Sequence, residues 1–132
     1  MKRIKIISIL LLTILFVSCT LDDSKSDGQY DIKNKSCIDI NGTEYSLCLD
    51  YVNDSRCPSN GVCVWEGNAS ANFILNSKTE NKPFTLNTHK NFQRDTVING
   101  LKIELVSVSP YPLLNSTSNQ NEYSVELNIS KE

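Results

Sequence analysis

The sixteen residues DSRCPSNGVCVWEGNA, numbered 54–69, contain two cysteines, a proline, two glycines and the only tryptophan of the chain. Cys57 and Cys63 stand six positions apart, so a disulfide between them would close a small ring. Such a ring removes conformational freedom from the unfolded chain and stabilises the folded one by about 2–3 kcal/mol. The stretch therefore predicts a rigid loop in an otherwise extended chain.

The residues around the ring also favour a pre-shaped backbone. Asp54 can accept backbone N–H groups in a turn and lies close enough to pair with Arg56. Pro58 restricts Cys57 to an extended conformation, and Gly61 allows a positive φ inside the ring. The segment is thus expected to hold one shape without help from a ligand.

Trp65 has two alternative roles in this loop. A strand expected to run from Val62 to Ala69, with Gly67 at a bulge or bend, would put Cys63 and Trp65 on one face. Trp65 then either covers the disulfide, as a core tryptophan of a sandwich does, or lies exposed as an anchor for a partner. The candidate binding residues of the loop are Asp54, Arg56, Pro58, Trp65 and Glu66.

The N-terminus has the layout of a secretory signal. Basic residues come first, an apolar run extends over residues 6–17, and Ser18 and Cys19 follow. The segment LFVSC resembles the lipobox of bacterial lipoproteins, in which the cysteine receives lipid, such as palmitate, and becomes the first residue. We therefore expect residues 1–18 to be cleaved and Cys19 to be lipidated, and a chance cysteine behind an ordinary signal is the alternative.

A polar segment follows the lipid site. Residues 19–36 contain almost no apolar side chains before Ile32, which predicts a flexible tether between the lipid and the domain. Asp22 and Asp23 resemble an acidic signal that directs some lipoproteins to the outer face of the outer membrane. The alternative is that these acidic residues only keep the tether soluble.

The remaining four cysteines are expected to form disulfides, because their number is even and the chain is exported. Asn41-Gly42 predicts a two-residue hairpin turn that sets Cys37 opposite Ser46, with Cys48 as a diagonal neighbour. Tyr45, Leu47, Leu49 and Tyr51 would then face the core together with Ile38 and Ile40. We predict the pairs Cys37–Cys48 and Cys57–Cys63, and no metal site, because the spacing is not of the C-x-x-C type.

Alternation of apolar and polar residues continues to the C-terminus. It marks ASANFIL, DTVINGLKIELVSV with a second Asn-Gly turn at residues 99–100, and YSVELNI, while KPFTLN is a shorter candidate. Six to eight strands separated by turn residues predict one all-β domain over residues 37–132, an antiparallel sandwich or a small barrel.

Catalytic signals are absent from the sequence. His89 has no adjacent nucleophile motif and is expected to be a solvated loop residue, and no phosphate loop or metal-binding motif occurs. Loss of the three basic residues before position 18 leaves a chain with a net charge near −5, which argues against nucleic acid as a partner. We expect no enzyme activity and no cofactor.

Three segments of the sequence carry a resemblance. They are DSRCP followed after four residues by CVWEGNA, then VSPYP, and a final strand. With these segments the chain resembles a group of small secreted or lipid-anchored bacterial proteins with no established activity. The resemblance covers about residues 39–129 and implies one β domain without suggesting catalysis.

The sequence as a whole predicts a bacterial outer-membrane lipoprotein that is anchored through Cys19, and that is surface-exposed if the acidic pair acts as a signal. Its β domain is expected to bind an unknown protein or small molecule. Two alternatives are an inhibitor of an incoming enzyme through the Cys57–Cys63 loop and a purely structural component of the envelope.

Overall fold

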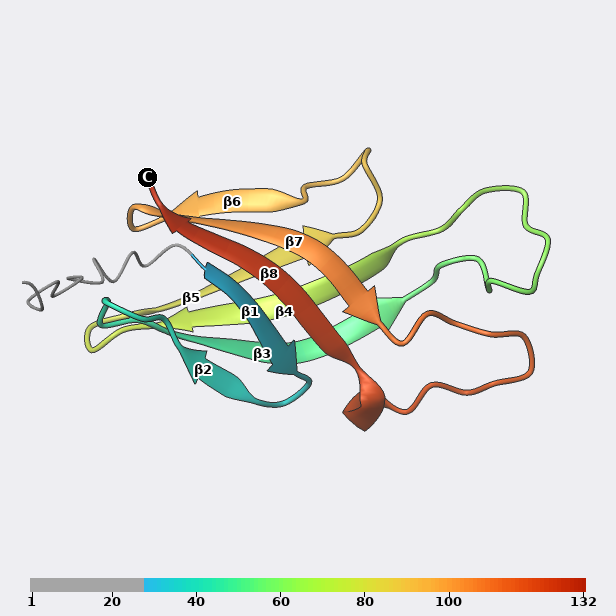
Figure 1. Ribbon diagram of the computed structural model, residues 1–132, viewed down its shortest axis with the longest axis horizontal. Helices are drawn as coiled ribbons and strands as arrows, with labels where there is room; N and C mark the ends of the chain where they lie inside the picture. Colours follow the sequence, from blue (N-terminus) through green and yellow to red (C-terminus); the bar gives the residue numbers. More distant parts are fainter. Residues whose placement is uncertain (1–27) are drawn as a thin grey trace, which may run out of the picture.

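Two four-stranded antiparallel sheets pack face to face in the computed structural model, which describes residues 28–132 (Figure 1). One sheet has the order β1-β8-β7-β6 and the other β2-β3-β4-β5. The strands are β1 (Gly28–Lys33), β2 (Cys37–Asp39), β3 (Ser46–Asp54), β4 (Ala69–Asn76), β5 (Asn81–Asn87), β6 (Asp95–Ile98), β7 (Leu101–Ser109) and β8 (Ser124–Lys131), and a short 3-10 helix, η1 (Gln120–Glu122), precedes β8. The predicted all-β sandwich is confirmed, and the sheets do not close into a barrel.

Alternating side chains from the two sheets build the core. Every second residue of β4 from Ala69 to Leu75 is buried, and β8 repeats the pattern from Val125 to Ile129. All 18 buried apolar residues of the core lie within residues 32–129. Residues 28–132 therefore contain both sheets and the core packed between them, so this part of the chain is used in the experiments below.

A β-bulge in β3 corrects one expected core residue. Leu49 pairs with Phe73 and Tyr51 with Asn72, so Asp50 has no partner on β4. The extra residue shifts the alternation by one position. Val52 consequently faces the core, and the prediction that Tyr51 does so is wrong, because its side chain is exposed.

The first hairpin has a different register from the one expected. Cys37 pairs directly with Cys48, and the N–H of Ile40 donates to the carbonyl of Tyr45, so the loop holds four residues instead of two. The Thr43 hydroxyl donates to the Ile40 carbonyl and stabilises this longer loop. The Cys37–Cys48 disulfide is confirmed, with its Cα atoms 4.0 Å apart, as direct partners and not as diagonal neighbours.

Part of the segment expected to be a flexible tether belongs to the folded domain. Residues 28–33 form β1, which pairs with β8 and buries Ile32 completely. A strand with polar residues on its outer face has the composition of a solvated linker. Only its pairing with another strand identifies it as a strand. The residues expected to form a signal peptide (1–18), the expected lipid site Cys19 and the acidic pair Asp22 and Asp23 lie outside the described residues.

Three connections gather at one end of the sandwich. They are residues 55–68 between β3 and β4, residues 88–94 between β5 and β6, and residues 110–119 between β7 and η1, and we call them the loop end (Figure 1). Gly28, where the described chain begins, lies toward the opposite end (Figure 1). The connections 55–68 and 110–119 project beyond the sheets, and 88–94 lies closer to them (Figure 1).

Candidate functional site: the loop end

The β3–β4 connection extends the hairpin and does not form the strand expected from Val62. The N–H of Ser55 donates to the carbonyl of Asn68, and the N–H of Cys57 donates to that of Glu66, both at 2.8 Å. Gly67 has φ +77°, and a Cβ there would stand 2.1 Å from the carbonyl oxygen of Ser55. Only glycine fits this position, which explains why the bend occurs where the sequence places Gly67.

A buried ion pair fixes the base of this connection. Arg56 donates to both carboxylate oxygens of Asp54, from Nε at 2.8 Å and from Nη2 at 2.7 Å. Only 6% of the Arg56 side chain and 3% of the Asp54 side chain are exposed. The Arg56 N–H also donates to Asp54 at 3.1 Å, as the predicted turn requires. Two of the five candidate binding residues are therefore enclosed in the fold and face no partner.

The guanidinium of Arg56 also holds the chain beyond β7. Nη1 donates to the carbonyl of Val108 and Nη2 to that of Pro110, each at 2.8 Å. The guanidinium carbon lies 4.4 Å from the ring centre of Tyr111, a cation–π contact. The phenol of Tyr123 donates to Asp54 at 3.1 Å. The segments DSRCP and VSPYP and the start of the last strand thus meet at one ion pair.

Burial and neighbouring groups shift the pKa values of Asp54 and Tyr123. Burial alone would raise the pKa of Asp54, but the hydrogen bonds and charge of Arg56, with the bond from Tyr123, hold it below its ordinary value. Burial raises the pKa of the Tyr123 phenol, and the negative charge of Asp54 adds to the effect. At neutral pH Asp54 is therefore ionised and Tyr123 keeps the proton that it donates.

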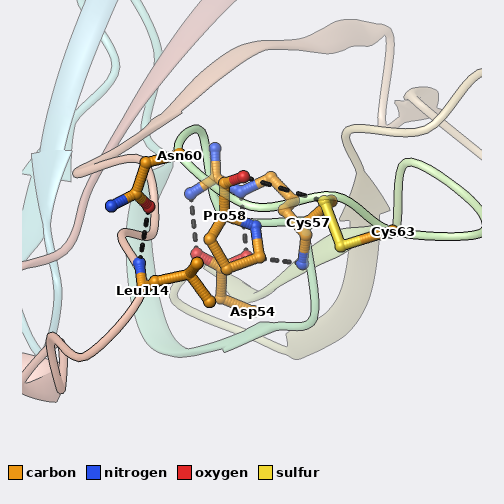
Figure 2. The surroundings of a disulfide bond; sticks show 7 residues. Asp54, Cys57, Pro58, Asn60, Cys63 and Leu114 are labelled. Carbon is orange, nitrogen blue, oxygen red and sulfur yellow. Dashed lines mark hydrogen bonds and ion pairs between the residues drawn. A yellow bond between two sulfur atoms is a disulfide. The ribbon is translucent and has the colours of Figure 1, made fainter.

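Further backbone bonds join the two projecting connections. The N–H of Ser59 donates to the carbonyl of Pro112, and the N–H of Leu114 donates to the side-chain oxygen of Asn60 at 2.7 Å. Figure 2 shows Asn60 directed at the backbone of Leu114, with the disulfide on the other side of the ring. The Cys57–Cys63 disulfide is confirmed. The two connections consequently form one supported unit.

Apolar side chains stand exposed on this unit. Val62 and Val64 are as exposed as in an extended peptide, at 103% and 105%, and Trp65 is 55% exposed. Of the two alternatives for Trp65, the structure therefore shows the exposed one. Leu113 and Leu114 add two half-exposed side chains from the neighbouring connection. The sequence signal for this surface is the lack of any charge over residues 57–65 and 110–121.

His89 is held between aromatic rings and is not the solvated residue expected. Its ring centre lies 5.6 Å from that of Trp65 and 5.7 Å from that of Phe92, and 9% of its side chain is exposed. Nε2 lies 2.8 Å from a carboxylate oxygen of Glu66, and Nδ1 accepts the N–H of Asn91. Both ring nitrogens therefore have partners within the loop end.

A groove of about 540 Å³ runs beside the aromatic cluster, between β7 and the 88–94 connection. Lys90 and Arg94 line it, together with Tyr111 and the end of β7. Within the described residues neither Lys90 nor Arg94 forms an ion pair, and the carboxylate of Glu66, which lies against Nε2 of His89, lines the groove as well. The groove is therefore the one place at the loop end with unpaired positive charge in the part of the chain described.

Comparisons with models of protein families, with curated proteins and with solved structures found no match. In residues 28–132 no group of three or more acidic, histidine or cysteine side chains is placed to hold a metal ion. No helix of this part of the chain has the length and apolar character needed to cross a membrane. The properties of the loop end must therefore be judged from its geometry.

Replacement of Arg56 by Gln should lower the free energy of unfolding by about 3–5 kcal/mol, because it leaves a buried carboxylate without its partner. Lys35→Gln, which breaks the exposed Lys35–Asp50 pair, should cost less than about 1 kcal/mol. Urea unfolding with both disulfides intact would measure both values. Similar small losses in the two variants would contradict the assignment.

The contribution of Asp54 to stability should disappear in acid. Because its folded-state pKa is depressed, the contribution is complete above the ordinary carboxyl pKa of about 4 and is lost as the pH falls through the folded value. The difference in unfolding free energy between the wild type and Asp54→Asn should therefore shrink below about pH 4. Asp95→Asn, which changes an exposed carboxylate, is the control and should cost little stability at neutral pH. A wild-type advantage over Asp54→Asn that widens in acid would be inconsistent with this account.

Proposed function

We propose that this chain is a bacterial lipoprotein, anchored in the outer membrane through a lipidated Cys19, whose β domain recognises a component of the cell envelope without catalysis. The loop end is its recognition surface. The supporting observation is the distribution of exposed apolar side chains. Seven of the ten large apolar residues exposed in the described part lie on the loop end: Val62, Val64, Trp65, Phe92, Tyr111, Leu113 and Leu114.

A cluster of exposed apolar side chains is uncommon on the surface of a soluble domain, and it is typical of interaction sites. Scattered exposed apolar residues need no explanation, but here they come from three connections at one end. The other exposed residues of this class, Tyr51, Val97 and Val106, lie on strands. The apolar surface therefore belongs to the connections and not to the sandwich frame.

Rigidity is the second support. The disulfide, the buried ion pair and the bonds between the connections hold the loop end in one shape before any partner arrives. A pre-organised surface loses little conformational entropy on binding. The polar residues before Gly28 supply a link to the proposed anchor, and the chain enters the domain away from the loop end (Figure 1).

Metabolic labelling with a fatty-acid analogue tests the anchor. The wild-type protein should take up the label, and the N-terminal peptide of the mature protein should begin at an acylated Cys19 by mass spectrometry. Cys19→Ser should abolish the label, and the double variant Cys37→Ser/Cys48→Ser should retain it. A mature N-terminus elsewhere, or an unmodified Cys19, would exclude the lipoprotein assignment.

Sedimentation with isolated envelope membranes tests the recognition surface. Residues 28–132, which lack Cys19, should co-sediment with the membranes, and Val62→Ser/Val64→Ser should not, because both side chains are fully exposed and available to a partner. Val97→Ser is the matched control, since it removes a half-exposed valine from β6. The proposal fails if no binding occurs, or if the double variant binds as well as the control.

A further inference from the structure

We propose that the loop end docks on a lipid bilayer with anionic headgroups, into which its uncharged tips insert. The inference deepens the proposed function, because it gives the partner of the same surface a chemistry, and it does not depend on the anchor at Cys19. Two independent features carry it: projecting aliphatic side chains without charge, and two cations behind them, Lys90 and Arg94, that form no ion pair in the described residues.

The first feature is the character of the tips. The connections 55–68 and 110–119 project past the ends of the sheets (Figure 1). Val62 and Val64 on one of them extend fully into solvent, with Leu113 and Leu114 half-exposed on the other. No charged residue occurs over 57–65 or 110–121, so the tips could enter hydrocarbon without burying a charge.

The aromatic residues lie where a bilayer interface would place them. Trp65 follows the two valines in the chain and packs its ring beside His89, which in turn contacts Phe92. Tryptophan is enriched at the boundary between hydrocarbon and headgroups, because its ring is apolar and its N–H is polar. From the projecting connection 55–68 to the connection 88–94, the exposed residues are therefore the two valines first and then Trp65 and Phe92.

The cations complete this order. Lys90 and Arg94 belong to the connection that lies closer to the sheets, and both line the groove beside β7 (Figure 1). Neither forms an ion pair in the described residues, although the chain as a whole has a net charge of −2. Unpaired cations behind an apolar tip match the negative phosphates that lie just above the hydrocarbon of a bilayer.

The residue types favour a bilayer over a protein partner. Protein interfaces derive most of their affinity from tryptophan, tyrosine and arginine, and valine and leucine are under-represented among the residues that dominate binding. Here four of the seven exposed apolar side chains of the loop end are valine or leucine, and they come from the two projecting connections. Aliphatic projections gain free energy in hydrocarbon without needing a shaped pocket.

The test uses residues 28–132 and vesicles of phosphatidylglycerol mixed with phosphatidylcholine, with pure phosphatidylcholine vesicles as the comparison. The protein should co-sediment with the anionic vesicles only. Trp65, the sole tryptophan, should shift its emission to shorter wavelength on binding and should be quenched by brominated lipid chains. Salt should weaken the association, because it screens the cations.

Variants separate the two contributions. Val62→Ser/Val64→Ser should weaken vesicle binding at least about ten-fold, and Lys90→Gln or Arg94→Gln about five-fold each. The controls Val97→Ser and Lys78→Gln, which change exposed residues away from the loop end, should bind as the wild type does.

Three outcomes would overturn the inference: no binding to the anionic vesicles, equal binding to phosphatidylcholine alone, or unchanged binding by the double valine variant. If the domain binds envelope membranes through Val62 and Val64 but ignores pure lipid vesicles, the partner is a protein. The proposed function would then stand while the lipid inference fails. If it binds neither, both fail.

Discussion

The buried pair of Asp54 and Arg56 is the interaction on which the loop end depends. Enclosing two charges costs free energy that their mutual attraction does not always recover, so such a pair is poor grounds for overall stability. Arg56, however, also donates to the carbonyls of Val108 and Pro110. Two of its hydrogen bonds thus join segments more than fifty residues apart, and the pair determines where these segments lie relative to one another.

That role explains why the most distinctive sequence segment is not itself a binding site. Asp54 and Arg56 point into the protein, Gly67 allows the backbone to close over them, and the disulfide limits the ring beyond. The residues left facing solvent include the uncharged run from Val62 to Trp65, with the carboxylate of Glu66 next to it. The disulfide and the ion pair of the segment support a surface formed by its uncharged residues. That surface makes the proposed contact with the envelope.

The sequence predicted features set by local chemistry and missed those set by distant contacts. The strands of the sandwich, the Asn99-Gly100 turn and the Asp54–Arg56 pair follow from alternation, turn residues and proximity, and the structure confirms them. The prediction of a two-residue turn at Asn41-Gly42 is wrong, because a side-chain hydrogen bond from Thr43 and the direct pairing of two cysteines favour a longer loop.

Other errors have the same origin. The bulge that exposes Tyr51 and the pairing that makes residues 28–33 a strand depend on β4 and β8, which lie far along the chain. His89 was expected in solvent, because its neighbours Trp65 and Glu66 come from another connection. The surface at the loop end could have been suspected only from two long runs without a charged residue.

Hydrogen exchange of single amides tests the central claim, that the ion pair holds the loop end to the sandwich. In the wild type the amides of Cys57 and Ser59, bonded to Glu66 and Pro112, should exchange slowly, whereas those of Val62 and Val64 exchange fast. In Arg56→Gln, Cys57 and Ser59 should lose far more protection than amides in the middle of β4 and β8. If Cys57 and Ser59 already exchange as fast as Val62 in the wild type, or lose no more protection than the sheets in the variant, the pair does not have this role.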